Sequence, residues 1–329
     1  MNNNFNEKSA GRDAIIEVAR TRGISVTNIY PGKVDRMDYA GKTEYLCRQF
    51  ISKTSSVAYH ACEDKNLTKT FLRQTGLSVP ESKIFQFTQL DEAINFAQQL
   101  GWPVVVKPKS SSKGDHVFPN IDNEQFIRDI WQDLYSHHKE YILEKHFNGI
   151  DYRFFATTEK VVAVSKRLPA NVTGDGNHTI KELVEIKNQT SNNSVKILLD
   201  EAVIRYLRHQ KIDENHVPRR DKQIFLRQNA NISTGGSSID VTDLASDGFK
   251  RLAVDAVRSI PGLCYAGVDI ISSAIEDKPN NENYVVIELN ASASIAMHQF
   301  PASGIPRDVA SEIVNIMFPE TKPKDENHV

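Results

Sequence analysis

Cysteine is scarce in this chain. Its three residues, Cys47, Cys62 and Cys264, lie far apart, and none forms a Cys-x-x-Cys pair. An odd number of scattered thiols argues against a disulfide framework and favours buried free thiols in a reducing compartment. The ten histidines form neither a His-x-His nor a His-Glu-x-x-His cluster, which argues against zinc. We therefore expect a cytoplasmic protein without disulfides or zinc.

Long apolar runs and an excess of one charge are also lacking. No apolar stretch approaches the ~20 residues that span a bilayer, and the first eight residues have no apolar segment of the kind that marks a signal peptide. The net charge is only −2, so there is no basic footprint for nucleic acid. Neither a membrane nor nucleic acid is an expected partner.

The rest of the composition is that of an ordinary globular protein, with 40% hydrophobic and 25% charged residues among 329. A chain of this length is expected to form about two domains. Helical and strand patterns alternate along it, which indicates α/β or α+β layers. The patterns predict helices over 64–76 and 122–137, a hairpin from strands 152–157 and 161–168, and a last helix from Pro306.

Two apolar runs near the C-terminus carry three oxygen-bearing side chains. Asp269 closes the first run, and Glu288 and Asn290 sit two apart on the second, so period-two alternation places both on one face of a strand. The polar segment 274–283 between them reads as a turn. A hairpin would bring the three together as hard ligands suited to Mg²⁺. The alternative is a solvated edge hairpin with incidental acids.

A second feature is an apolar strand over 102–108 that ends with a lysine, Lys107. A lysine that closes a buried strand is costly unless its charge meets an anion. A loop of small residues follows, in which the backbone N–H groups of Ser110, Ser111, Ser112 and Gly114 could approach phosphate groups. The alternative is a lysine that reaches the surface, followed by a flexible linker.

The order of these motifs resembles the ATP-grasp superfamily of carboxylate–amine ligases, and in particular the ATP-grasp parts of cyanophycin synthetases and bifunctional glutathione synthetases. The resemblance covers roughly residues 11–318. It is carried by Thr54-Ser-Ser-Val-Ala-Tyr59, Asp64-Lys65-x-x-Thr-Lys69, Val-Val-Val-Lys107-Pro, Ile-Leu-Glu144-Lys-x-Phe147, Lys166-Arg167-x-Pro-Ala-Asn171, Gly174-Asp-Gly176-x-His178-Thr-Ile180, Asp269, Glu288-x-Asn290 and Met297-His298.

The resemblance implies an α+β fold in which two lobes grip ATP between antiparallel sheets. We expect a small α/β N-terminal region over 1–60, a small lobe over 61–147, a large lobe over 148–319 and a disordered tail over 320–329. The implied reaction is the activation of a carboxylate by ATP as an acylphosphate, followed by attack of an amine to give an amide, ADP and phosphate. The implied partners are small carboxylates and amines, such as amino acids or short peptides, and relatives suggest a homo-oligomer.

The resemblance also implies roles for individual residues. ATP would be bound by Lys65, Lys107, Ser110, Ser111, Ser112, Gly114, Glu144, Lys145, Phe147 and Asp151. Two Mg²⁺ ions, or Mn²⁺, would be held by Asp269, Glu288 and Asn290. The catalytic charges would be Arg227, Lys107 and Arg167, and the acyl substrate would meet Arg153, Arg167, Asn171 and Asn229. Arginine suits such roles because its fork donates two parallel hydrogen bonds to a phosphate or carboxylate.

One departure keeps two other functions open. The phosphate loop has a single glycine, Gly114, where relatives usually carry two or three, and mixed charges follow it. An ATP-binding module without ligase turnover, or a phosphotransferase that stops at the phosphorylated product, are therefore alternatives to the ligase. The acyl donor and the amine are not specified by the sequence, although the segment 232–238 could bind a carboxylate in a nest of backbone N–H groups.

Overall fold

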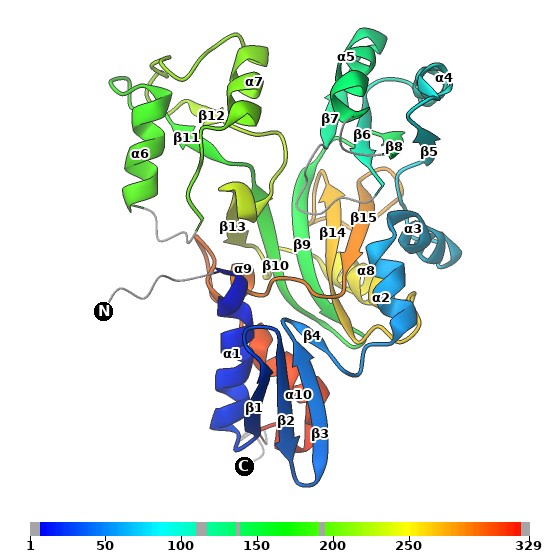
Figure 1. The fold of residues 1–329 in the computed structure, drawn as a ribbon, viewed down its shortest axis with the longest axis vertical. Helices are drawn as coiled ribbons and strands as arrows, with labels where there is room; N and C mark the ends of the chain where they lie inside the picture. Colours follow the sequence, from blue (N-terminus) through cyan, green and yellow to red (C-terminus); the bar gives the residue numbers. More distant parts are fainter. Residues whose placement is uncertain (1–6, 110–116, 136–138, 191–194, 324–329) are drawn as a thin grey trace.

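The computed structural model describes residues 7–109, 117–135, 139–190 and 195–323 (Figure 1). Within these ranges the chain forms an N-terminal region, a small lobe, a large lobe and a smaller helical extension of the large lobe. Every sheet is antiparallel, as expected for an α+β fold of two lobes. No helix among the described residues is both long and apolar enough to cross a bilayer.

The N-terminal region is a helix packed on a four-stranded meander. Gly32 and Gly41, with φ of 70° and 82°, occupy the turns between successive strands, where a side chain would be strained. The predicted α/β character of this region is wrong, because tight turns leave no crossover helix for parallel pairing. The elements are α1 (Glu7–Thr21), β1 (Ser25–Tyr30), β2 (Val34–Tyr39), β3 (Lys42–Cys47) and β4 (Phe50–Ile51).

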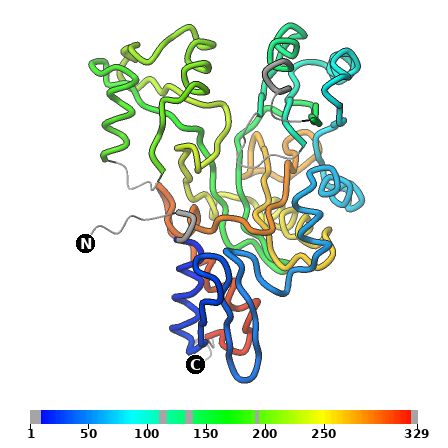
Figure 2. The backbone as a smooth tube through the Cα atoms, viewed as in Figure 1, coloured from blue at the N-terminus to red at the C-terminus, as the bar shows by residue number. Residues whose placement is uncertain are grey.

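The C-terminal helix, α10 (Val309–Met317), completes the core of this region. Ile313 is buried in one cluster with Ile15 and Met37. Figure 2 shows this red C-terminal segment beside the blue N-terminal one. The N-terminal region is therefore not independent of the end of the chain.

The boundaries of α10 differ slightly from the prediction. The helix begins at Val309 rather than Pro306, because the Asp308 side chain accepts a hydrogen bond from the Ser311 N–H and caps it. The predicted disordered tail starts with an ordered turn, η2 (Pro319–Thr321). Residues 324–329 lie outside the described part.

The small lobe is a four-stranded sheet in the order β5-β8-β6-β7 with two helices. Ile94 and Trp131 from the helices are buried together with Phe85, Val106 and Tyr141 from the sheet. The helix predicted over 122–137 is confirmed as α5; it begins at Glu124, and its predicted end falls on residues outside the described ranges. The elements are β5 (Ser82–Gln86), α4 (Leu90–Leu100), β6 (Val104–Pro108), β7 (Phe118–Ile121), α5 (Glu124–Tyr135) and β8 (Glu140–Lys145).

The large lobe is built on a five-stranded sheet in the order β13-β10-β9-β14-β15. Both predicted hairpins are confirmed, since β9 pairs with β10 and β14 pairs with β15. Phe249 and Val257 from the covering helix are buried against Phe154 and Val268 of the sheet. The elements are β9 (Ile150–Thr157), β10 (Val161–Leu168), β13 (Ser237–Asp240), α8 (Asp247–Arg258), β14 (Tyr265–Ser272), β15 (Tyr284–Asn290) and α9 (Ala296–Gln299).

Two helices before the small lobe also pack on this sheet. Ala61 of α2 (Ser56–Glu63) and Leu72 of α3 (Lys65–Gln74) belong to the core of the large lobe. The predicted start of the small lobe at residue 61 is therefore too early, because the apolar face of α3 is buried against the other sheet. The predicted cap of α3 is confirmed, since Asp64 accepts hydrogen bonds from the N–H groups of the first turn.

The helical extension of the large lobe lies between β10 and β13 in the sequence. Most of its buried side chains come from a two-stranded sheet and two helices. The predicted capping box is confirmed: the Thr179 N–H donates to Glu182, and the Glu182 N–H donates to the Thr179 hydroxyl. The elements are β11 (Asn171–Thr173), α6 (Ile180–Thr190), α7 (Glu201–His209), β12 (Gln223–Phe225) and η1 (Ile232–Thr234).

Candidate functional site

One row of polar residues crosses the five-stranded sheet from edge to edge. The pairing registers align Asp240, Ser165, Arg153, Asp269 and Glu288, one from each strand. Directly paired residues of neighbouring strands share a face, so the five side chains leave the sheet on the same side. We call this set the polar row. The sequence predicted three of its members, and the sheet brings them together.

Asp269, between Arg153 and Glu288 in the polar row, is clamped by two arginines. Arg153 donates from Nε to Oδ1 at 2.5 Å and from Nη2 to Oδ2 at 2.6 Å, and Arg167 donates to Oδ2 at 2.9 Å. Burial alone would raise the pKa of Asp269, but the charges of Arg153 and Arg167 lower it to about 2. The carboxylate is therefore ionised at neutral pH, and it fixes both guanidinium groups.

Arg167 is shared between two carboxylates. It lies two residues along β10 from Ser165, on the same face of the sheet, and donates to Asp151 Oδ1 at 2.6 and 2.8 Å. Burial raises the pKa of Asp151, although the charge of Arg167 opposes that shift. In this structure Asp151 therefore serves as an anchor for Arg167.

A glycine makes room for Arg153. A Cβ on Gly267 would lie 2.7 Å from the Ala293 Cβ and 3.1 Å from the Arg153 Cδ. Contacts this short would displace the arginine from the position in which it meets Asp269. The Ala-Gly-Val-Asp run of β14 therefore supplies both the carboxylate and the space for its partner.

His298 of α9 supports the polar row from the side. Its Nδ1 is 2.9 Å from the Ser165 Oγ, and its Nε2 is buried with no hydrogen-bond partner in the described part of the chain. Burial, helped by the nearby charge of Arg153, lowers the pKa of His298 to about 3. The ring is therefore neutral at pH 7, beside two permanent cations.

The three predicted metal ligands meet at one edge of the sheet. Asp269 and Glu288 are directly paired across β14 and β15, and the Asn290 amide donates to Glu288 Oε1 at 3.3 Å. Lys65, at the start of α3, lies 3.8 Å from Glu288 Oε2. Among the described residues no group of three or more His, Cys, Asp or Glu side chains could hold a metal. Two carboxylates with one amide oxygen nonetheless fit Mg²⁺, which binds through one or two carboxylates together with substrate phosphates.

The predicted nucleotide residues of the small lobe form a buried ionic cluster. Glu144 of β8 accepts from Lys107 of β6 at 2.5 Å and from Lys69 of α3 at 2.6 Å. Burial would raise the pKa of Glu144, but the two lysines lower it to about 2. The cluster fits the phosphates of a nucleotide, because it holds two ammonium groups for one carboxylate. The Glu144 carboxylate is fully used by lysines here, rather than turned to an adenine.

Other predicted residues have local partners. Lys145 donates to the carbonyl oxygens of Gly101 at 2.7 Å and Trp102 at 3.3 Å, and Phe147 is half-buried just after β8. The predicted loop residues Ser110, Ser111, Ser112 and Gly114 lie outside the described residues.

The remaining predicted substrate residues lie in or next to the helical extension. The Asn171 amide donates to the Pro169 carbonyl at 2.7 Å, and Arg227 pairs with Asp200 at the start of α7. Asn229 is half-buried two residues further on. The structure thus collects the predicted residues into three groups: the polar row with its neighbours, the lysine–glutamate cluster, and this extension.

Sequence reasoning missed several members of these groups. Lys69 was part of a recognised motif without a role, and its position four residues after Lys65, on the same helix face, was the available signal. Ser165 and Asp240 carried no local signal, because only the register of β10 and β13 places them in the polar row. Arg307 was missed as well; it pairs with Asp240 at 2.8 Å.

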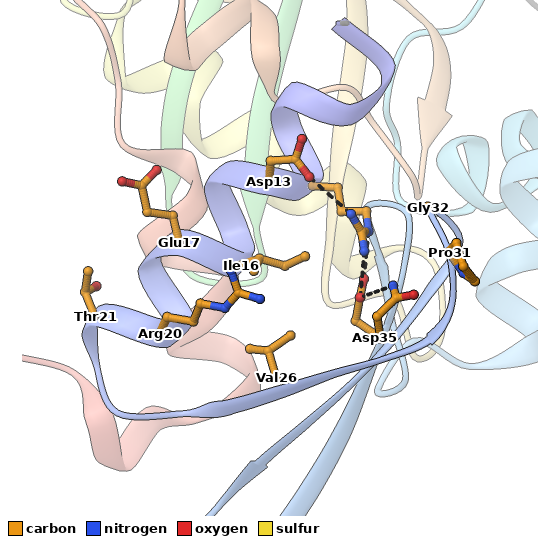
Figure 3. A pocket seen from close by; sticks show the side chains of 11 residues that line it. Asp13, Ile16, Glu17, Arg20, Thr21, Val26, Pro31, Gly32 and Asp35 are labelled. Carbon is orange, nitrogen blue, oxygen red and sulfur yellow. Dashed lines mark hydrogen bonds and ion pairs between the residues drawn. The ribbon is translucent and has the colours of Figure 1, made fainter. Parts of the chain in front are cut away.

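A cavity of about 640 Å³ opens in the N-terminal region, between α1 and the β1–β2 hairpin (Figure 3). Its floor is polar: Arg12 donates to Asp35 at 2.6 and 2.7 Å, and Asn28 donates to the same carboxylate at 2.8 Å. None of the predicted site residues lines it. These bonds fasten the meander to α1.

Comparison with known proteins agrees with this geometry. A model of the RimK-like ATP-grasp domain matches residues 62–242, more than half of the chain. Cyanophycin synthetase from Synechocystis sp. is 35% identical over 274 residues, which cover 80% of this chain and 31% of that protein. The bifunctional protein GshAB of glutathione biosynthesis from Pasteurella multocida is 32% identical over 298 residues, which cover 86% of this chain and 39% of that protein.

A solved structure shares the fold as well. The crystal structure of a bifunctional glutathione synthetase from Pasteurella multocida matches with a TM-score of 0.69 and 30% identity, over 94% of this chain and 43% of that one. The chain thus spans only 31% to 39% of these two curated relatives.

Proposed function

Because the chain belongs to the RimK-like ATP-grasp family, we propose that it is an ATP- and Mg²⁺-dependent carboxylate–amine ligase. It would activate a carboxylate as an acylphosphate and join it to an amino acid or peptide amine, releasing ADP and phosphate. The observation that carries this proposal is the polar row together with its neighbour Arg167, because one sheet face offers paired carboxylates beside two arginines. That arrangement places anionic and cationic partners where a phosphoryl group and a carboxylate must meet.

ATP would lie between the lobes. Lys107 and Lys65 would bind its phosphates, with the loop residues Ser110, Ser111, Ser112 and Gly114 above them. The Lys145–Phe147 backbone would meet the edge of the adenine ring, and Asp151 the ribose. The expected contact of Glu144 with the adenine amino group is not part of this proposal, because both of its oxygens accept from lysines. Support comes from the excess of ammonium over carboxylate groups at Lys107 and from Lys65 beside Glu288.

Asp269, Glu288 and Asn290 would hold two Mg²⁺ ions, with Mn²⁺ as a substitute. Mg²⁺ at this position would neutralise charge on the transferring phosphoryl group. Arg153 and Arg167 reduce the negative charge of Asp269 before any ion arrives. Lys65 does the same for Glu288 at 3.8 Å.

The acyl substrate would approach the arginine side of the polar row. Arg153 and Arg167 are held there rigidly, and positioning of this kind supplies much of the rate in a reaction without a covalent enzyme intermediate. Arg227 would stabilise the transferred phosphoryl group; its Nε is buried with no hydrogen-bond partner among the described residues. Asn171 and Asn229, on the same extension, would complete the substrate pocket.

The setting of the reaction is part of the proposal. We infer small-molecule substrates, a cytoplasmic location and assembly into a homo-oligomer. The location is supported by the three free thiols and by the need for ATP. The two relatives described above are named for cyanophycin synthesis and for glutathione biosynthesis, which supports amino acids or peptides as substrates.

Phosphate release tests the function. The protein would be incubated with ATP, Mg²⁺ and pools of amino acids and short peptides, beside Glu288→Ala and Glu276→Ala. Glu276 is exposed in the turn of the same hairpin and serves as the matched control. A ligase requires two pools together, loses release in Glu288→Ala and keeps it in Glu276→Ala.

Two other outcomes would contradict the proposal. Release with a single pool and a stable phosphorylated product would indicate a phosphotransferase. Tight ATP binding with no release from any pool would indicate a nucleotide-binding module.

A further inference from the structure

Lys69 is a buried lysine that the proposed mechanism does not use. It projects from α3 to the small lobe, where its Nζ lies 2.6 Å from Glu144 Oε2 and 3.0 Å from the Ser82 Oγ. Its side chain is 1% exposed. Burying an ammonium group is costly even when it is paired, and an apolar side chain of similar volume is often as stable. A lysine at this position therefore calls for an explanation beyond packing.

Glu144 divides its two oxygens between two lysines. Oε1 accepts from Lys107 and Oε2 accepts from Lys69, and all three side chains are almost fully buried. When all three groups are ionised, one carboxylate neutralises only one of the two ammonium groups. Charge-assisted hydrogen bonds to one carboxylate compete, since each cation withdraws charge from the oxygen that serves the other.

This sharing matters because Lys107 has two possible partners. Under the proposed function it binds an ATP phosphate, so phosphate must compete with Glu144 for the same ammonium group. A carboxylate that serves Lys107 alone would hold it more tightly than one that also serves Lys69. The strength of the Glu144–Lys107 pair thus affects how readily ATP recruits Lys107.

We propose that Lys69 is a positioning residue that loosens the hold of Glu144 on Lys107 and thereby raises the affinity for ATP. Lys69 lies on α3, the helix that begins with Lys65. One helix would therefore serve ATP twice: Lys65 would bind a phosphate directly, and Lys69 would act through Glu144. Ser82 keeps the Lys69 ammonium group in place beside Glu144. This inference rests on the proposed role of Lys107 and adds a residue to it.

Calorimetric titration with MgATP tests the inference on wild-type protein, Lys69→Met and Arg73→Met. Arg73 lies one turn further along α3 and donates to the Pro80 carbonyl at 3.3 Å, so its replacement removes the same charge from the same helix without touching Glu144. Lys69→Met is expected to weaken ATP binding roughly tenfold, the scale of one charge-assisted hydrogen bond. Arg73→Met is expected to stay within about twofold of wild type.

Steady-state kinetics separates positioning from general damage. In Lys69→Met the KM for ATP should rise by the same factor, with little change in kcat. The reason is that the competing Glu144–Lys107 contact weakens the binding of ATP equally in the ground state and in the transition state. Lys69→Gln keeps a donor for Glu144 without the charge and should give an intermediate KM. If Lys69→Met does not fold, Lys69→Gln decides: weaker ATP binding supports the inference, and unchanged binding overturns it.

The results also separate this inference from the proposed function. Wild-type protein that does not bind ATP would overturn both. Wild-type protein that binds ATP, with a folded Lys69→Met variant that binds it equally well, would overturn the role of Lys69 alone. Equal weakening in Lys69→Met and Arg73→Met would overturn it too, since the charge of the helix would then be the cause.

Discussion

At the scale of single residues, Asp269 depends on Arg153 for its charge. The two side chains are 5% and 10% exposed and meet through two hydrogen bonds. Arg153→Met leaves the buried carboxylate to Arg167 alone, and breaking a buried pair in this way typically costs about 3–5 kcal/mol. We expect a loss of that order in the free energy of unfolding, measured by urea denaturation.

Arg36 provides the control for this prediction. It pairs with Asp38 at 2.9 Å on the surface of the N-terminal sheet, where water screens both charges. Arg36→Met should therefore change the stability little. Similar losses in the two variants would show that the carboxylate of Asp269 does not rely on Arg153.

His298 should make stability depend on pH. Its pKa is about 3 in the folded protein because of burial and near 6.5 in an unfolded chain. The unfolded chain takes up the proton first as the pH falls, so this contribution is complete above about pH 6.5 and is lost toward pH 3. Urea denaturation between pH 7.5 and 5 should show a steeper fall in stability for wild type than for His298→Gln, by up to about 1.4 kcal/mol per pH unit.

His178 serves as a comparison, because its pKa is shifted upward whereas that of His298 is shifted downward. Its ring donates a hydrogen bond to the Asp175 carboxylate, which raises the pKa of His178, so its contribution is present at low pH and is lost as the pH rises through the folded value. His178→Gln should therefore not flatten the acid side of the curve. If His178→Gln reduced the loss of stability at acid pH as much as His298→Gln, the buried His298 ring would not be the cause of that loss.

At the scale of elements, two helices with the same type of cap can be compared. Asp64 caps α3, which carries Lys65 and Lys69, and Asp308 caps α10 in the N-terminal region. Replacing either by alanine should cost about 1 kcal/mol of unfolding free energy. Only Asp64→Ala should also weaken ATP binding, because it frees the turn that presents Lys65. Equal ATP affinity in the two variants would show that Lys65 does not bind the phosphates.

Local patterns in the sequence were enough for elements with a cap or a turn of their own. Asp64 and the Thr179–Glu182 box marked helix starts, and the polar segment 274–283 marked the turn that pairs Asp269 with Glu288. The meander of the N-terminal region was not recognised, because its short strands alternate polar and apolar residues only weakly. Its sheet is fixed by α10, nearly three hundred residues away.

The same distinction holds within the site. Residues in contiguous motifs, such as Lys107 and Asp269, could be predicted, whereas Ser165, Asp240 and Lys69 join the site only through strand register or helix packing. No local pattern encodes those relations. The clamp of two arginines on a predicted metal ligand was unpredictable for the same reason.

At the scale of the whole molecule, separate cores should respond separately to damage. Ile313 of α10 is buried with the N-terminal meander, and Ile127 of α5 is buried in the small lobe. Replacing either by alanine should cost about 2–5 kcal/mol. Hydrogen exchange should then speed up in β2 and β3 for Ile313→Ala, and in β6 and β8 for Ile127→Ala. Uniform acceleration in both variants would show that the cores unfold as one unit.

The order of the strands in the five-stranded sheet also sets the moment at which the site can exist. β9 can pair with β10 as soon as both leave the ribosome, but its other neighbour, β14, follows more than a hundred residues later. Until then Arg153 has no Asp269 and one side of β9 is an open edge, the kind of edge that invites wrong pairing. During synthesis the nascent chain therefore carries an Arg153 that has not yet met Asp269 and an unpaired strand edge where the polar row will form. Helix α8 is made in that interval and packs on this sheet, so it can cover β9 before β14 arrives.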